Sequence, residues 1–168
     1  MEENFNHTPL IRLKQIGRIR TPYNRKAPYQ PIDEEGVFYL ELFPEYVEGL
    51  ESIETFKYIY VIFFMDRAKP AELIVEPPWA EGKKVGVFAS RSPSRPNPIG
   101  LSVVRLLKIE DNRVYISAID ALDGTPLLDI KPYVKHLDSK EDANLGWAGD
   151  VRDKDHLILH LKGIPHDF

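Results

Sequence analysis

Cysteine is absent from the 168-residue sequence, which excludes disulfide bonds and any zinc or redox site built on thiolates. Histidine is scarce. His156 and His160 share a face of either a strand or a helix, but no third ligand is spaced to complete a metal site. We therefore expect no bound metal.

Long hydrophobic runs are also missing. No stretch approaches the roughly 18 consecutive apolar residues that a membrane-spanning helix requires. The first ten residues have neither the cationic start nor the apolar core of a secretory signal. These absences predict a cytoplasmic protein without a membrane partner.

A doubly wound nucleotide-binding domain is excluded as well, because no G-x-G-x-x-G turn follows a strand-like run and strands do not alternate with long helices. The 14 prolines leave few stretches for an extended helix, which we expect only over 44–55 and 132–142. Short β-rich runs recur instead, over 13–20, 36–42, 58–65, 84–89, 101–109, 113–119 and 157–161. The pattern predicts a mainly β protein: a single-domain β-barrel of short antiparallel strands with a few short helices, not a Rossmann fold.

Two of these runs have informative side-chain patterns. The run 58–65 is apolar on both faces, which predicts a central strand. In 101–109, Leu101, Val103, Leu107 and Ile109 alternate with more polar positions. This alternation has the period of a strand that is buried on one face.

The net charge of -4 hides a segregation of charge. Six basic residues and no acidic residue lie between positions 4 and 32, and six more basic residues and no acidic one lie between 82 and 109. If the two windows meet in space, they form a positive surface of the kind that binds a phosphate-bearing partner. The alternative is that they are ordinary solvated charges on strands and loops.

The stretch GVFASRSPSRPNPIGLS, residues 86–102, combines three prolines with Arg91 and Arg95. Proline restricts the backbone, so the loop is stiffened before any ligand binds. The planar guanidinium of arginine binds carboxylates and phosphates through two parallel hydrogen bonds. We expect an anionic or adenosyl ligand here. The alternative is a rigid crossover whose arginines pair with acidic residues.

Two further stretches contain candidate binding residues. DALDGTPLLDIKPYV, residues 120–134, places three aspartates near glycine and proline, although its DGTP part alone is an ordinary turn. PYNRKAPYQP, residues 22–31, interleaves tyrosines with basic residues. Tyr23 and Tyr29 could stack on a base while Arg25 and Lys26 contact phosphates; the alternative is a plain proline-rich loop.

Together, the 86–102 and 120–134 stretches resemble the TsaA-like family, also called TrmO, of β-barrel methyltransferases that use S-adenosylmethionine. The resemblance covers about residues 14–135 and includes IGRIRTPY (16–23) and GLESIETFKYIYVIFFM (49–65) in family order. It implies an N-terminal extension over 1–12, the barrel domain over 13–135, and a C-terminal tail over 136–168 that contains a final strand.

The resemblance also implies an activity. The family methylates N6 of N6-threonylcarbamoyladenosine at position 37 of tRNA, in the anticodon loop, and its members dimerise and bind the methyl donor near the dimer interface. Where members have His-Gln, this sequence has Met65 and Asp66, and Asp66 could hold ribose hydroxyls. The positions that correspond to donor-binding residues are Gln30, Pro31, Ile32, Met65, Asp66, Arg91, Leu101, Asp123, Gly124, Thr125 and Pro126.

Methylation of an exocyclic amine needs a group that stabilises the charge developing on nitrogen. We expect Asp123 or Asp129 to supply it, because both flank the donor motif. Arg95, Lys131 and Tyr133 are candidates for recognising the threonyl carboxylate and the adenine. Two alternatives stay open: methylation of another nucleoside or a small metabolite, and a binding module that holds an adenosyl ligand or RNA without turnover.

Overall fold

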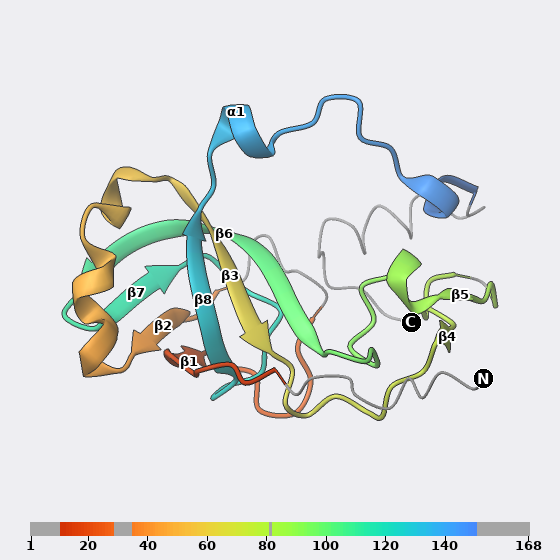
Figure 1. Cartoon of the computed structure of the whole chain (residues 1–168), viewed down its shortest axis with the longest axis horizontal. Helices are drawn as coiled ribbons and strands as arrows, with labels where there is room; N and C mark the ends of the chain where they lie inside the picture. Colours follow the sequence, from red (N-terminus) through yellow and green to blue (C-terminus); the bar gives the residue numbers. More distant parts are fainter. Residues whose placement is uncertain (1–10, 29–34, 81, 151–168) are drawn as a thin grey trace, which may run out of the picture.

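Six antiparallel strands form a closed barrel in the computed structural model, which describes residues 11–28, 35–80 and 82–150 (Figure 1). Each strand hydrogen-bonds to a neighbour on both sides. Around the barrel the strands are β1 (Gly17–Arg20), β2 (Tyr39–Leu42), β7 (Arg113–Ile116), β6 (Ile99–Glu110), β3 (Tyr58–Phe64) and β8 (Pro126–Pro132). The mainly β class with few short helices is confirmed.

The core lies inside the barrel and follows the alternation of the strands. Every second side chain points inward, so a short strand contributes two or three apolar residues to the interior. Burying each one fully stabilises the fold by about 1.5–3 kcal/mol. The fully buried members include Ile19, Leu40, Ile59, Val61, Val114 and Leu127.

The orientation expected for the strand over 101–109 is wrong. Leu101, Val103 and Leu107 are 50%, 49% and 58% exposed, whereas Ser102 and Val104 are buried. The reason is the pairing register, in which Ser102 and Val104 lie opposite buried residues of β3. Because side chains alternate, a strand placed in that register turns its apolar set to the outside. β6 therefore has an apolar outer face.

Strand β3 lies between β6 and β8, and every strand of this closed barrel likewise has two neighbours. The outer face of β3 is nevertheless partly exposed, with Tyr58 46% and Phe64 39% accessible. Strand β8 was not expected from the sequence, because prolines at both ends and two charged residues weaken its apolar alternation. Its register against β3 shifts between Ile62 and Phe63.

The expected helices are shorter than their ranges. The 44–55 segment consists of two 3-10 helices, η1 (Pro44–Leu50) and η2 (Ile53–Thr55), separated by Ser52 at a φ of 67°. That left-handed backbone cannot continue a right-handed helix. The 132–142 segment contains only the four-residue α1 (Lys135–Asp138). No helix within the described ranges combines the length and the apolar character needed to cross a lipid bilayer.

A second, smaller sheet lies beside the barrel and consists of β4 (Ile74–Val75) and β5 (Val85–Gly86) (Figure 1). Of the strand expected over 84–89, only β5 forms, and the 3-10 helix η3 (Val87–Ala89) follows it. The strand expected over 157–161 lies outside the described residues.

After α1, the chain passes over to the small sheet and ends its described part in η4 (Gly146–Asp150) (Figure 1). There the Trp147 ring stacks on the Trp79 ring with their centroids 5.0 Å apart, and its indole nitrogen donates a hydrogen bond of 2.8 Å to the Ala89 carbonyl. These contacts hold the segment after α1 against the 86–102 stretch.

Gly100 provides a test of the packing inside the barrel. It is buried on β6 opposite Phe63, and an added Cβ would overlap the Phe63 ring. Because overpacking a core costs about 1–3 kcal/mol, we expect Gly100→Ala to lower the free energy of unfolding by that amount in a urea titration. Gly86→Ala is the control, since its Cβ would meet no atom within 4 Å. Equal urea midpoints for both variants would contradict this packing.

Candidate functional site

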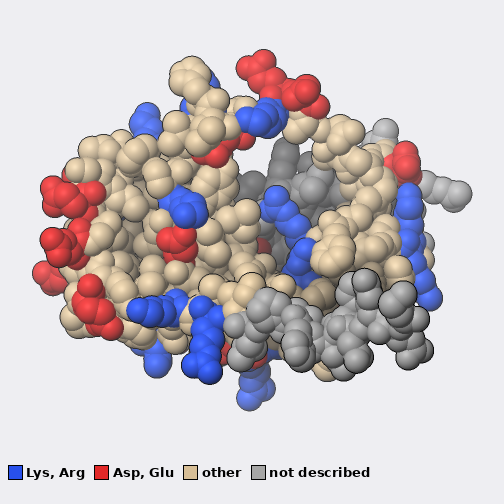
Figure 2. Space-filling model, in the orientation of Figure 1, with Lys and Arg blue, Asp and Glu red and all other residues tan. Residues whose placement is uncertain are grey.

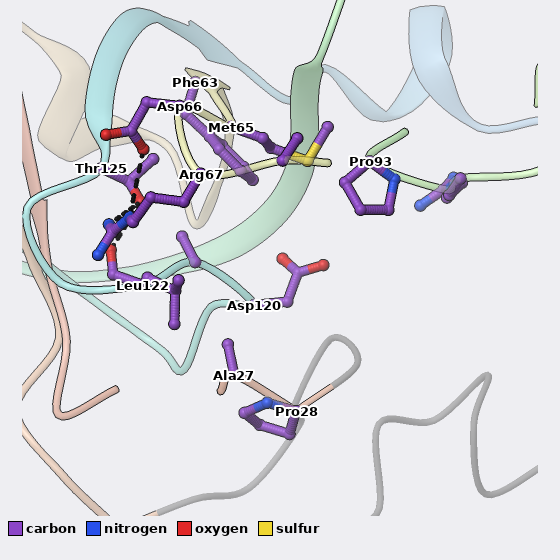
Figure 3. A pocket seen from close by; sticks show the side chains of 13 residues that line it. Ala27, Pro28, Phe63, Met65, Asp66, Arg67, Pro93, Asp120, Leu122 and Thr125 are labelled. Carbon is purple, nitrogen blue, oxygen red and sulfur yellow. Dashed lines mark hydrogen bonds and ion pairs between the residues drawn. The ribbon is translucent and has the colours of Figure 1, made fainter. Parts of the chain in front are cut away.

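A pocket of about 260 Å³ lies at one end of the barrel, where the segments that follow β1, β3 and β7 meet the loop before β6 (Figure 3). Its walls are mostly apolar, with charged groups from Asp66, Arg67, Arg91 and Asp120. The remaining lining residues are Ala27, Pro28, Phe63, Met65, Ala68, Pro93, Ala121, Leu122 and Thr125. Segments that are far apart in the sequence therefore build a single cavity.

Arg67 connects two walls of the pocket (Figure 3). One guanidinium nitrogen donates to the Asp123 carbonyl at 2.8 Å and to the Thr125 hydroxyl at 3.2 Å. Its Nε lies 3.4 Å from an Asp66 carboxylate oxygen. Thr125 is buried and donates its own hydroxyl to the Leu122 carbonyl at 2.7 Å. The sequence analysis missed Arg67, although it directly follows the expected Met65 and Asp66.

Asp120 is the second charged lining residue, after Arg67, that is absent from the expected site residues, even though it opens the 120–134 stretch. The buried hydroxyl of Ser102 donates to an Asp120 carboxylate oxygen at 2.6 Å, a distance typical of a bond to a charged acceptor. In Figure 3 the Asp120 carboxylate points into the space between Leu122 and Pro93. This hydrogen bond fixes the orientation of a carboxylate inside the pocket.

Four of the expected donor-binding residues line the pocket: Met65, Asp66, Arg91 and Thr125. The Arg91 side chain is exposed and forms no ion pair with any residue of the described part of the chain. Its charge is therefore available to an anionic ligand. Gln30, Pro31 and Ile32 lie outside the described residues.

The other expected donor-binding residues are not among those that line the pocket. The Asp123 carboxylate accepts a hydrogen bond from the Thr21 amide at 3.2 Å and lies 3.6 Å from an Arg20 nitrogen. Gly124 and Pro126 flank the lining residue Thr125, and the φ of 78° at Gly124 favours glycine in this turn. Leu101 lies on the outer face of β6.

Two of the candidate substrate-binding residues, Arg95 and Lys131, contact other residues of the chain. Arg95 donates to the Ser90 and Ser92 carbonyls at 3.2 and 3.4 Å and so holds its own loop together. The alternative in which Arg95 pairs with an acidic side chain is not seen among the described residues, because its hydrogen-bond partners are these backbone carbonyls. Lys131 forms a 2.8 Å ion pair with Asp129 on β8, and neither of the two lines the pocket.

Tyr133 and Tyr23 are both occupied by aromatic neighbours. The Tyr133 ring lies 5.6 Å from that of Tyr60, whose pKa is raised mainly by desolvation. Tyr23 is buried with its ring centroid 5.7 Å from that of Phe38, so it packs into the core and is not available to stack on a base. Tyr29 lies outside the described residues.

Residues of the two basic windows lie at more than one place on the surface. Arg91 lies at the pocket, whereas Arg18 and Arg20 lie on β1 and Lys108 lies near the end of β6. In Figure 2, acidic side chains gather at the left edge of the molecule, over η1 and η2. Lys and Arg side chains gather along its lower edge, over β1. Within the described ranges, no group of three or more His, Asp or Glu side chains is placed to hold a metal ion.

Comparison with known proteins gives the family. Residues 18–139 match the family described as the tRNA-methyltransferase O N-terminal domain. A probable S-adenosyl-L-methionine-binding protein of Archaeoglobus fulgidus is 43% identical over 154 residues, which is 90% of this chain and 42% of the relative. A human tRNA (adenine(37)-N6)-methyltransferase is 41% identical over 96 residues, which is 56% of this chain and 22% of the relative.

A solved structure agrees with the sequence relatives. The crystal structure of TrmO from Pseudomonas aeruginosa is similar to this one with a TM-score of 0.70 and 38% sequence identity, over 85% of this chain and 63% of that chain. This chain thus spans less than two thirds of the length of each of these three proteins. Because the family match over residues 18–139 includes most of the barrel, the chain belongs to the tRNA-methyltransferase O N-terminal domain family.

Proposed function

We propose that this protein is a tRNA methyltransferase of the cytoplasm that transfers a methyl group from S-adenosylmethionine to N6 of N6-threonylcarbamoyladenosine at position 37, in the anticodon loop. The observation that carries the proposal is the pocket at the barrel end, whose walls come from both long motifs of the sequence. The names of the relatives, one for S-adenosyl-L-methionine binding and one for methylation of adenine 37, support the donor and the RNA partner.

The residues present suit the chemistry of the donor. A carboxylate accepts hydrogen bonds from ribose hydroxyls, and Asp66 presents one that is partly exposed. Arg91 offers a planar guanidinium for the carboxylate of the amino-acid part. Phe63 and Met65 provide an apolar wall for the ring and the thioether. The proposed donor set also includes the lining residue Thr125 with its neighbours Asp123, Gly124 and Pro126. It further includes the expected residues Gln30, Pro31, Ile32 and Leu101.

When bound, the donor supplies an electrophilic methyl group, so the main task of the protein is alignment. Good alignment of two reactants lowers a barrier by about 7–11 kcal/mol. The pocket is suited to this task because Arg67 and Ser102 hold its polar walls through hydrogen bonds of 2.6 to 3.2 Å. As the bond to nitrogen forms, N6 becomes positively charged and must release its proton.

We propose Asp120 as the carboxylate that stabilises this charge and accepts the proton. It lines the pocket, and the Ser102 hydroxyl holds it in place. The sequence analysis expected Asp123 or Asp129, but Asp123 contacts Arg20 and Asp129 contacts Lys131. In this arrangement Asp123 is a positioning residue, since its carbonyl anchors Arg67.

We also propose that the protein forms a homodimer through the outer face of β3 and β6. Residues Tyr58, Phe64, Ile99, Leu101 and Val103 are 39% to 50% exposed on this face. A contiguous apolar surface of this kind marks an interaction site. A second copy packed there would bring Leu101, together with Lys131 and Tyr133 of β8, to the interface. From there these side chains could contact the pocket of the second copy.

The methyl transfer is tested by incubating the protein with S-adenosylmethionine and with tRNA that carries the threonylcarbamoyl group, followed by digestion and mass measurement of the nucleosides. We expect the modified adenosine to gain one methyl group, and unmodified tRNA to gain none. Arg91→Ala is the control variant that removes donor binding from this pocket. Binding of the donor without transfer would favour another nucleoside, a metabolite or a module without turnover.

The carboxylate is tested by comparing Asp120→Asn, Asp123→Asn and Asp129→Asn in the same assay. We expect Asp120→Asn to lower kcat by about 100-fold or more, the size of a general-base effect, while the donor Kd stays near that of the unaltered protein. Asp129→Asn should keep full turnover, because that side chain lies outside the pocket. Full turnover by Asp120→Asn, or its loss in Asp129→Asn alone, would contradict the assignment.

The dimer is tested with Val103→Glu, which places a charge in the proposed apolar interface. We expect sedimentation velocity to show a dimer for the unaltered protein and a monomer for the variant. Leu137→Glu on α1 is the control, since Leu137 is 70% exposed and lies on another element. A dimer that survives Val103→Glu and breaks with the control would place the interface elsewhere.

A further inference from the structure

The outer wall formed by β1, β2, β7 and the end of β6 is aromatic and cationic, whereas the outer face of β3 and of the first part of β6 is apolar. Strands β1, β2 and β7 and the end of β6 carry two tyrosines and four cationic side chains on their outer faces. We call this surface the β1–β2–β7 face, and it consists of Arg18, Arg20, Tyr39, Lys108, Arg113 and Tyr115.

The strand register places these residues side by side. Arg20 pairs with Tyr39, and Tyr39 pairs in turn with Tyr115. The two tyrosine rings lie 5.4 Å apart at an angle of 35°. The Arg113 guanidinium lies 5.2 Å from the Tyr39 ring, and the Lys108 ammonium lies 4.4 Å from the Tyr115 ring. Across these four strands, two neighbouring aromatic rings thus lie between cations.

The charge of this face is positive although the whole chain is negative. Three carboxylates contact its four cations: Glu41 lies 2.9 Å from Arg20 and 4.0 Å from Arg113, Glu110 lies 2.6 Å from Lys108, and Asp123 lies 3.6 Å from Arg20. Hydrogen bonding to Glu110 raises the pKa of Lys108, so this cation stays charged throughout the neutral range. The Arg113 and Lys108 side chains are still 47% and 55% exposed. Ion pairs this exposed are weak, so a phosphate can compete for these cations.

The face is continuous with the pocket. Arg20 reaches from β1 to the Asp123 carboxylate at 3.6 Å. The carbonyl of the same Asp123 accepts the 2.8 Å hydrogen bond from Arg67, which lines the pocket. One residue therefore separates the edge of the pocket from the first cation of the face.

We propose that the β1–β2–β7 face binds the RNA strand that adjoins the nucleotide in the pocket, with the cations on its phosphates and the tyrosines against unpaired bases. Single-stranded nucleic acid is bound in this way by positive surfaces with aromatic side chains, because every base has a ring face. A site for any polyanion needs only cations, so the two tyrosine rings, which can stack on bases, favour a nucleic acid as the ligand of this face. The proposal rests on the proposed function, since it requires tRNA as the substrate.

The charge component is tested with Arg18→Ala/Lys108→Ala/Arg113→Ala, which leaves Arg20 and the pocket intact. Binding of tRNA is measured from low to high salt, and donor binding is measured alongside. We expect the RNA Kd to rise at least tenfold at low salt and the slope of log affinity against log salt to fall by about 2 to 3, as expected for lost phosphate contacts. The Kd of the donor and kcat at saturating RNA should not change.

The matched control is Lys57→Ala/Lys69→Ala/Lys84→Ala, which removes the same charge from exposed positions elsewhere. If it weakens RNA binding as much as the first triple variant, only net charge matters and the proposed face is wrong. An unchanged KM for tRNA in the first triple variant, with an active parent protein, overturns the face alone. If the unaltered protein does not bind RNA, the proposed function fails together with the face.

The stacking component is tested with Tyr115→Leu against Tyr115→Phe. We expect the leucine variant to weaken RNA binding about five- to tenfold with an unchanged salt slope, and the phenylalanine variant to bind as the unaltered protein does, because its ring is kept. Thermal unfolding shows whether either variant has lost stability. Equal RNA affinity for all three proteins would exclude base stacking at this face.

Discussion

The pairing of β8 with both β1 and β3 is the constraint on which the rest of this structure depends. β8 closes the barrel, since β1 and β3 each hydrogen-bond to it. The turn that enters β8 contributes Leu122 and Thr125 to the pocket, and the stretch before it contributes Asp120. Without closure, the ends of β1, β3 and β7 would not meet, and the residues of the pocket would lie on separate segments.

Hydrogen bonds to backbone and to buried hydroxyls then shape the pocket at this end of the barrel. Arg67 joins the segment after β3 to the turn before β8, and Ser102 joins β6 to Asp120. Arg95 holds the proline-rich loop through two of its own carbonyls. These contacts hold the polar groups in place before a ligand arrives, which lowers the cost of ordering them on binding.

Different strands give the outer surface of the barrel different chemical character. The β3 and β6 wall is apolar, the β1–β2–β7 face is aromatic and cationic, and the η1 and η2 segment is acidic (Figure 2). In a protein with a net charge of -4, this division gathers cations and aromatic rings on the face proposed for a phosphate backbone, with Glu41 and Glu110 among them. The apolar wall is the surface proposed above for a second copy, and the β1–β2–β7 face is the one proposed for RNA.

The sequence by itself determined the β class and the motif pair, because these depend on local alternation and on residue types at fixed spacing, and its resemblance to the TrmO family pointed to four of the residues that line the pocket. Tertiary structure alone decided which side of β6 faces inward, since the register against β3 turns the polar Ser102 inward and the apolar Leu101 outward. It also decided which aspartate enters the pocket. Asp120 and Asp123 are both carboxylates of the segment between β7 and β8, and the positions of Ser102 and Arg20, which come from other strands, direct one toward the pocket and the other away from it.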